Sequence, residues 1–141
     1  MKDRKFRAWD VIGNKWVFGD LVHNQKVTTT GLEPRVMVGG YEVSPDSVGL
    51  FTGLHDKKGR EIYEGDIIFS KFTDGSSGYL LVGWNENEAS FGVINAYSYQ
   101  SKKKGYDISE FLNYVLLAHL HNAAVFEVAG NIIQNEELLN V

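Results

Sequence analysis

Short runs of aromatic and β-branched residues, each followed by a turn segment containing Asp, Gly or Asn, dominate the first two thirds of the chain. The first example is at the N-terminus, where 6–9 and 15–18 flank the sequence Asp-Val-Ile-Gly-Asn of 10–14. Gly and Asn tolerate the left-handed backbone that a tight turn requires, so this pattern predicts a β-hairpin.

The same pattern recurs in the middle of the chain. Strand-like runs at 50–54 and 60–63 flank 55–59, in which Asp56 precedes Gly59 by three residues. This spacing predicts a type I turn in which Gly59 supplies a positive φ at a bulge. Further strand-like runs follow at 67–69, 79–84 and 90–94. Short strands at such close spacing favour a small bent antiparallel sheet or an SH3-like barrel.

Residues 19–48 give a weaker signal. Within them, 26–30 is rich in β-branched residues and 35–38 precedes a Gly-Gly break, so both resemble strands. We expect no more than two short strands in this stretch. The sequence leaves open whether 19–48 forms ordered strands or a long loop.

After Gly105 the apolar period changes from that of a strand to that of a helix. A helix over 108–121 would carry one apolar stripe, made by Ile108, Phe111, Leu112, Val115, Leu116 and Leu120. A last strand is expected at 124–129. A final helical turn is expected at 135–139, with Asn135 as its cap.

Together these elements predict a mainly β or α+β fold, a single domain over 1–141 in which the helix packs on a bent sheet. The length supports this, since 141 residues is about the size of one domain. We expect aromatic residues of the predicted strands and helix to form much of the core. The candidates are Phe6, Trp16, Phe18, Phe69, Trp84, Phe91 and Phe111.

Composition and segment lengths exclude several classes of protein. The chain has no cysteine, which excludes disulfides, thiol catalysis and cysteine-ligated metal sites. Its longest apolar run, 114–118, is far shorter than the roughly 20 residues of a membrane-spanning helix. The basic N-terminus is not followed by the apolar segment of a signal peptide. We therefore expect a soluble protein that stays in the cytoplasm and has no membrane partner.

The densest group of polar residues surrounds the central turn. It comprises His55 and four acids, Asp56, Glu61, Glu64 and Asp66. Neighbouring carboxylates can bind a hard divalent cation or supply an acid–base pair. A structural role is the simpler explanation, because Asp commonly bonds to backbone amides in turns. We favour that role, and so expect no catalytic residue, no metal site and no cofactor.

Aromatic and basic residues that alternate just before the predicted helix form a second candidate site. Its members are Tyr97, Tyr99, Lys102, Lys103, Lys104 and Tyr106, and a second such patch is formed by Arg4, Lys5, Phe6, Arg7 and Trp9. Aromatic rings beside cations bind single-stranded nucleic acid by stacking. The net charge of −4 and the ordinary role of lysines in solvated loops argue against this function. Nucleic acid is therefore the less favoured partner.

Three segments of the sequence resemble the YopX family, small proteins encoded by phages and prophages. They are Phe-Arg-Ala-Trp-Asp at 6–10, Thr-Gly-Leu-His-Asp-Lys-Lys-Gly-Arg-Glu-Ile-Tyr-Glu-Gly-Asp-Ile at 52–67, and Phe-Glu-Val-Ala-Gly-Asn-Ile at 126–132 followed by Asn-Glu-Glu-Leu-Leu at 135–139. Two residues depart from the family pattern, Ala129 for a larger aliphatic residue and Glu136 for a common proline. The resemblance implies a phage or prophage origin and the cytoplasm of a bacterial host. It implies no reaction, because the family has no assigned activity or catalytic residues.

The leading functional hypothesis is a non-enzymatic accessory protein that binds to itself, as a homo-oligomer, or to a host or phage protein. It is favoured because no catalytic or metal-binding constellation is recognisable and because aromatic-rich strands can present an exposed apolar patch. The alternatives are nucleic-acid binding through 97–106 and an enzyme built on Glu61, Glu64 and Asp66.

Overall fold

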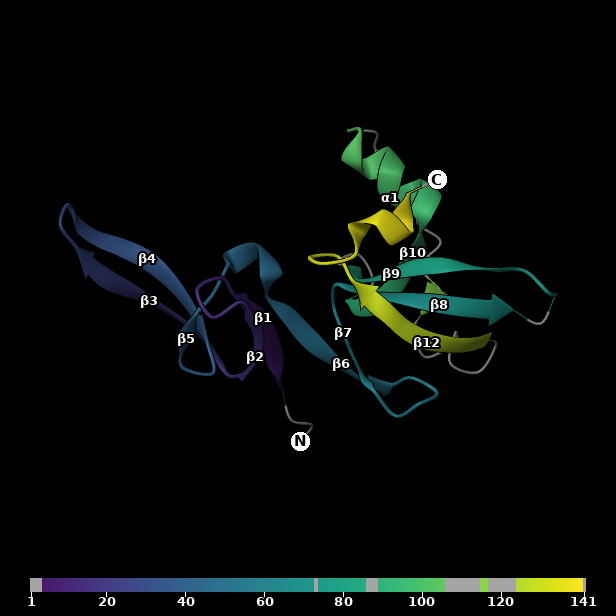
Figure 1. Ribbon diagram of the computed structural model, residues 1–141, viewed down its shortest axis with the longest axis horizontal. Coiled ribbons are helices and arrows are strands. Elements are labelled where there is room, and N and C mark those ends of the chain that lie inside the picture. Colours follow the sequence, from purple (N-terminus) through teal and green to yellow (C-terminus); the bar gives the residue numbers. More distant parts are fainter. Residues whose placement is uncertain (1–3, 73, 86–88, 106–114, 117–123, 141) are drawn as a thin grey trace. The chain divides into compact units, whose positions relative to one another are not determined.

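The structure, a computed structural model, describes residues 4–72, 74–85, 89–105, 115–116 and 124–140. Regular structure in these residues is mostly antiparallel β, with one α-helix, which confirms the predicted fold class (Figure 1). The chain divides into two compact units, unit 1 (1–51) and unit 2 (52–141). A single domain over 1–141 stays a prediction.

Unit 1 contains a hairpin, a three-stranded sheet and the start of a further strand. Its elements are β1 (Phe6–Asp10), β2 (Lys15–Gly19), β3 (Leu21–Thr28), β4 (Gly31–Val38), β5 (Tyr41–Glu42), the 3-10 turn η1 (Pro45–Ser47) and the first part of β6 (Gly49–His55). β2 and β6 pair with opposite edges of β1. The predicted first hairpin is confirmed, because the Asp10 carboxylate accepts a hydrogen bond from the Gly13 amide at 3.0 Å and Asn14 has a φ of 52°.

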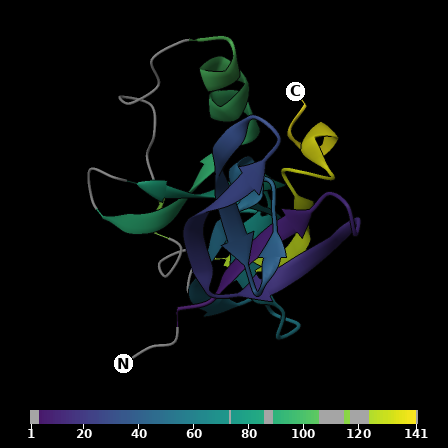
Figure 2. The same cartoon turned by 90° about the vertical axis from the view of Figure 1, so that its left-hand side faces the viewer.

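A long hairpin formed by β3 and β4 extends from unit 1, and we call it the arm (Figure 1; in Figure 2 it points toward the viewer). The expectation of no more than two short strands in 19–48 is wrong, because β3 and β4 have eight residues each and β5 adds a third strand. At the base of the arm Leu21, Val36 and Val38 pack in the core. Toward the tip both faces are exposed. The sequence signal is weak there because strands without a buried face show no apolar alternation.

Unit 2 is built on a five-stranded antiparallel sheet in the order β11-β10-β9-β8-β12. Its elements are the rest of β6, β7 (Glu61–Tyr63), β8 (Asp66–Phe72), β9 (Ser77–Asn85), β10 (Ser90–Asn95), α1 (Ala96–Lys103), β11 (Val115–Leu116), β12 (Ala124–Asn131) and the 3-10 turn η2 (Glu136–Leu139). The sheet curls, as β8, β9 and β12 show in Figure 1, which confirms the predicted bent antiparallel sheet. A bulge between Val128 and Gly130 shifts the register of β12.

The buried core is largely aliphatic, which corrects the expectation of an aromatic core. The buried clusters are Ile62, Ile68, Val82, Val93 and Phe126 in unit 2, and Ala8, Val17, Val38 and Val43 in unit 1. Of the aromatic candidates, Phe6 is half-buried and packs against the cluster of unit 1. The other described candidates are half-buried or exposed, and Phe111 lies outside the described residues. Trp9 and Trp16 show why: they pair across β1 and β2 on the face opposite Ala8, with ring centroids 5.3 Å apart. Aromatic pairs thus stabilise the other face of the hairpin.

The α-helix lies at a different place from the predicted one. Within the predicted helix over 108–121 the structure describes only Val115 and Leu116, and there the prediction is wrong, because they form β11 and pair with β10. Cross-strand pairing outweighs a local helical period. Instead α1 follows Asn95, whose side chain accepts a hydrogen bond from the Ser98 amide at 2.8 Å. Among the described helices, none is long and apolar enough to cross a lipid bilayer.

The helical turn expected near the C-terminus is present as η2, and Asn135 is its N-cap residue as predicted, but without a side-chain capping bond. Its backbone carbonyl accepts a hydrogen bond from the Leu138 amide, while its side-chain Oδ1 accepts one from the Asn131 amide at 3.1 Å. Asn131 Oδ1 in turn accepts from the amides of Ile133 and Gln134. The side chains of the two asparagines therefore close the loop between β12 and η2.

Candidate functional site

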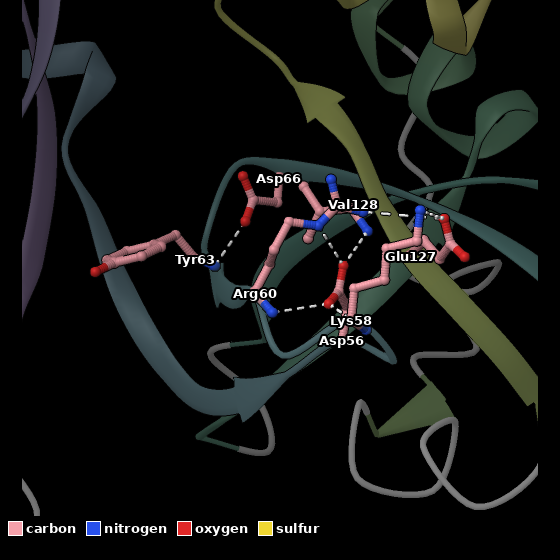
Figure 3. A network of polar contacts seen from close by, with 7 residues as sticks. All are labelled: Asp56, Lys58, Arg60, Tyr63, Asp66, Glu127 and Val128. Atoms are coloured by element: carbon pink, nitrogen blue, oxygen red, sulfur yellow. Dashed lines mark hydrogen bonds and ion pairs between the residues drawn. The ribbon is translucent and has the colours of Figure 1, made fainter.

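Asp56 lies in the turn between β6 and β7, at the centre of a polar network (Figure 3). Its Oδ1 accepts hydrogen bonds from the amides of Lys58 and Arg60, and its Oδ2 accepts from the Arg60 guanidinium and the Val128 amide, all at 2.9 Å. The bonds to the two turn amides close the turn, and Gly59 has the predicted positive φ, 83°. The bond from Val128 ties the turn to β12. The predicted role of Asp56 in closing its turn is confirmed. Asp56 also connects this turn to β12.

The surroundings of Asp56 favour its ionised form. Burial raises the pKa of Asp56, but the hydrogen bonds from Val128 and from the Arg60 amide and guanidinium outweigh burial and hold the pKa below its usual 3.8. The Glu127 carboxylate completes the network, 3.5 Å from Lys58 Nζ and 3.9 Å from the Arg60 guanidinium. These outer pairs are exposed and contribute little to stability. The buried Asp56 carboxylate is therefore the main stabilising group of the network.

Asp66 closes the next turn, between β7 and β8. Its buried carboxylate accepts a hydrogen bond from the Tyr63 amide at 2.8 Å. Gly65, with a φ of 91°, donates its amide to the Val82 carbonyl, and its own carbonyl accepts from the Ile132 amide. A positive φ is readily adopted by glycine, which explains the Glu-Gly-Asp sequence. This turn thus connects β9 and the residue after β12.

The acids of the central cluster do not converge on one metal site. Asp56 and Asp66 bind backbone amides in different turns, and Glu61 accepts a hydrogen bond from the Tyr63 hydroxyl at 3.3 Å. Glu64 lies in the same turn as Gly65, half-buried. In the part of the chain that the structure describes, no three His, Asp or Glu side chains are grouped so that they could hold a metal ion. The geometry favours a structural role for these acids.

Two residues of the predicted nucleic-acid site lie against the C-terminal turn. Tyr99 donates a hydrogen bond from its hydroxyl to Glu136 at 2.8 Å, and Lys103 forms an ion pair with the same carboxylate. Burial, together with the hydrogen bond and the charge of Glu136, raises the pKa of Tyr99 to about 12. Gln100 also donates to the Leu139 carbonyl at 2.9 Å. These side chains hold α1 against η2, so they have a structural role in unit 2.

The other described members of that site are exposed. Tyr97 is 71% exposed and lies about 200° around the helix from Tyr99. Lys102 and Lys104 are exposed at the C-terminal end of α1, and Tyr106 lies outside the described residues. Tyr97 and Tyr99 therefore do not share one face of α1.

In the second basic and aromatic patch, cations already lie on aromatic rings. The Arg7 guanidinium is 4.3 Å from the centre of the Trp16 ring, and Lys5 Nζ is 5.4 Å from that of Phe51. These contacts join β1 to β2 and to β6. Two cations of this patch are therefore already engaged with rings outside it, Trp16 and Phe51.

Three residues that complete these networks were not predicted from the sequence: Arg60, Val128 and Asn131. A local signal exists for Arg60, because a basic residue four positions after a turn Asp can reach its carboxylate. A signal also exists for Asn131, since Asn bonds to amides two and three residues later in turns. For Val128 there is no local signal, because its amide meets Asp56 across 72 residues.

A family model described as "YopX protein" matches residues 5–140. The chain belongs to the YopX family. The match spans both units and confirms the resemblance carried by the three sequence segments. The family's central segment contains both turns that Asp56 and Asp66 close, so its recognisable residues include the ones that hold these turns together.

A solved structure is also similar to this family member. The crystal structure of protein EF1440 from Enterococcus faecalis matches with a TM-score of 0.54 and 22% sequence identity, covering 99% of this chain and 100% of that one. At this identity the similarity shows a shared fold alone. No curated protein sequence matches the chain.

Proposed function

We propose that this member of the YopX family is a non-enzymatic accessory protein that acts through protein–protein contacts, with itself or with a host or phage protein. Family membership supports a phage or prophage origin and, with it, the cytoplasm of a bacterial host as the working location. The bonding of Asp66 to the Tyr63 amide supports a non-enzymatic role, because the enzyme hypothesis counts the Asp66 carboxylate among its reacting groups.

The exposed tip of the arm carries the proposal. Val27 is 84% exposed and Leu32 64% exposed, and the two residues pair across the hairpin. Val22, further down β3, is a third exposed apolar side chain of the arm and lies on its opposite face. A two-stranded hairpin is marginally stable in water by itself, and an exposed apolar patch is typical of an interaction site. A protein partner that covers the arm would bury these side chains and stabilise the hairpin.

Photo-crosslinking tests this proposal. A tagged chain with p-benzoylphenylalanine in place of Leu32 is produced in a host bacterium, and the cells are irradiated. We expect discrete covalent adducts heavier than the 15.8 kDa chain, because a partner covers the tip of the arm. Mass spectrometry of each adduct identifies it as a second copy or as another protein.

Ile12 provides the matched control position. It is an apolar residue, 97% exposed, in the β1–β2 turn and outside the arm. The proposal predicts that the same probe at Ile12 gives no discrete adduct. Equal adducts from both positions, or none from Leu32, would contradict it.

A further inference from the structure

The two long edges of the arm differ in how many backbone groups are free to pair with another strand. The outer edge of β4 is already paired with β5 at Met37 and Val38, and nearer the tip it contains Pro34, which has no amide hydrogen. The outer edge of β3 has eight residues and no proline. β3 is an edge strand of its sheet. An edge strand of this length is a template for pairing with another chain.

The hydrogen bonds of the arm define which backbone groups of β3 point outward. The Val36 carbonyl accepts from the Val43 amide, so Val36 directs its backbone groups away from β3. Val36 pairs with His23. In an antiparallel ladder, two opposite residues direct their backbone amides and carbonyls either both toward each other or both away from each other. His23 therefore also directs its amide and carbonyl outward. Since the direction alternates, the outward residues of β3 are Leu21, His23, Gln25 and Val27.

We infer that the partner of this edge is a second copy of the chain, whose β3 pairs antiparallel with the first about a two-fold axis at Asn24. In this register Leu21 lies opposite Val27 and His23 lies opposite Gln25. All four outward residues of each strand then exchange backbone hydrogen bonds with the same four residues of the other. A two-fold axis perpendicular to the sheet keeps the two faces of both strands aligned, as a symmetric dimer requires.

The side chains fit this register. It places Val27, the most exposed apolar residue of the arm, beside Leu21 of the second copy, so that each copy covers the other's apolar residue. Lys26 would lie opposite Val22 and not opposite a second cation. Its charge is already balanced within the chain, because Lys26 Nζ lies 2.8 Å from the Glu42 carboxylate. Lysine on an edge strand normally opposes pairing, and this ion pair weakens that effect.

This inference rests on the proposed function and names one of its two partners. One added strand buries less area than the roughly 1,600 Å² of a standard interface, so we expect a dissociation constant in the micromolar range. The pairing joins two three-stranded sheets into one six-stranded sheet and gives β3 a partner on both edges.

A single introduced cysteine tests the register, because the chain has none of its own. In the inferred dimer the two copies of Asn24 face each other as a non-hydrogen-bonded pair, with Cα atoms about 4.5 Å apart, which a disulfide can bridge. We expect the Asn24→Cys variant to form a disulfide-linked dimer under mild oxidation. The matched control is Val27→Cys, which is more exposed but would lie about 20 Å from its copy along the strand. It should remain monomeric on a non-reducing gel.

A second pair of variants tests the hydrogen bonds. Gln25→Pro removes an outward amide without removing a bond to β4, and Pro34 already occupies the opposite position on the same rung. We expect it to raise the dissociation constant in sedimentation velocity at least tenfold, while Gln25→Thr keeps the wild-type value. Similar melting temperatures would show that both variants fold.

A monomeric wild-type chain at about 100 µM, or equally fast oxidation of Asn24→Cys and Val27→Cys, would overturn the inference. If photo-crosslinking from Leu32 then gave adducts with another protein, the proposed function would still hold, with that protein as the partner.

Discussion

Replacing Asp56 by Ala is expected to lower the free energy of unfolding by about 3 kcal/mol, because it removes a buried carboxylate that accepts four hydrogen bonds. The change leaves the amides of Lys58, Arg60 and Val128 without their acceptor. It also leaves the Arg60 guanidinium without its nearest carboxylate. For a chain of this length the loss corresponds to roughly 10 °C in melting temperature. Urea unfolding followed by circular dichroism measures it.

Asp74 provides the matched control for this experiment. It lies in the β8–β9 loop, and its carboxylate accepts hydrogen bonds from the Ser76 amide at 2.8 Å and the Ser76 hydroxyl at 2.6 Å. Because Asp74 is exposed, water replaces these bonds when the carboxylate is removed. We expect Asp74→Ala to change the stability little. Equal losses from Asp56→Ala and Asp74→Ala would contradict the role given to the central turn.

Replacing Gly39 by Ala is expected to lower the free energy of unfolding by about 3 kcal/mol, from a strained φ and an overpacked contact together. Gly39 lies in the turn between β4 and β5, at the base of the arm, with a φ of 60°. A Cβ atom there would lie 2.3 Å from the Phe18 carbonyl oxygen. That oxygen belongs to the backbone of β2, so the contact is relieved only if a strand moves.

The neighbouring Gly40 separates the two causes. It has a φ of 87°, but a Cβ atom at this position meets no other atom within 4 Å. Gly40→Ala therefore carries only the backbone penalty, and we expect a loss of about 1 kcal/mol. Thermal unfolding of both variants measures the difference. If the two alanines cost the same, the close approach of the β4–β5 turn to β2 does not stabilise the base of the arm.

The turns of this fold could be predicted from the sequence because their determinants are local. Asp10 bonds to an amide three residues later, and Asp56 bonds to amides two and four residues later. The chemistry of such a turn is contained in the few residues that form it. The longest of the three family segments, 52–67, contains the central turn.

The arm and the helix could not be placed from the sequence, because tertiary context determines both. In the arm, His23, Asn24 and Gln25 are all exposed, so no apolar alternation indicates a strand. Their strand conformation comes from pairing with β4. At Val115 and Leu116 the sequence has a helical period, yet pairing with β10 determines the local structure. In both places the deciding contact is with another strand.

The candidate sites show the same limit. Residue types predicted that Asp56 closes a turn, but its bond to Val128 depends on how β12 pairs in the sheet. Likewise, nothing near Tyr99 in the sequence indicates that Glu136 would accept its hydrogen bond, 37 residues later. The residue types of a candidate site could therefore be predicted from the sequence. Whether those residues are already bonded to other parts of the chain could not.

Measuring the pKa of Asp56 tests most directly whether the central acids hold turns together. The carboxyl carbon signal of Asp56 is followed by NMR from about pH 2 to about pH 7. We expect a midpoint below 3.8 that does not move when Mg²⁺ is added. Because the folded pKa lies below that of the unfolded chain, the contribution of Asp56 to stability is then complete above about pH 4 and is lost as the pH falls through that midpoint. A midpoint at or above 3.8, or one that falls on saturation with Mg²⁺, would contradict the structural role of the central acids.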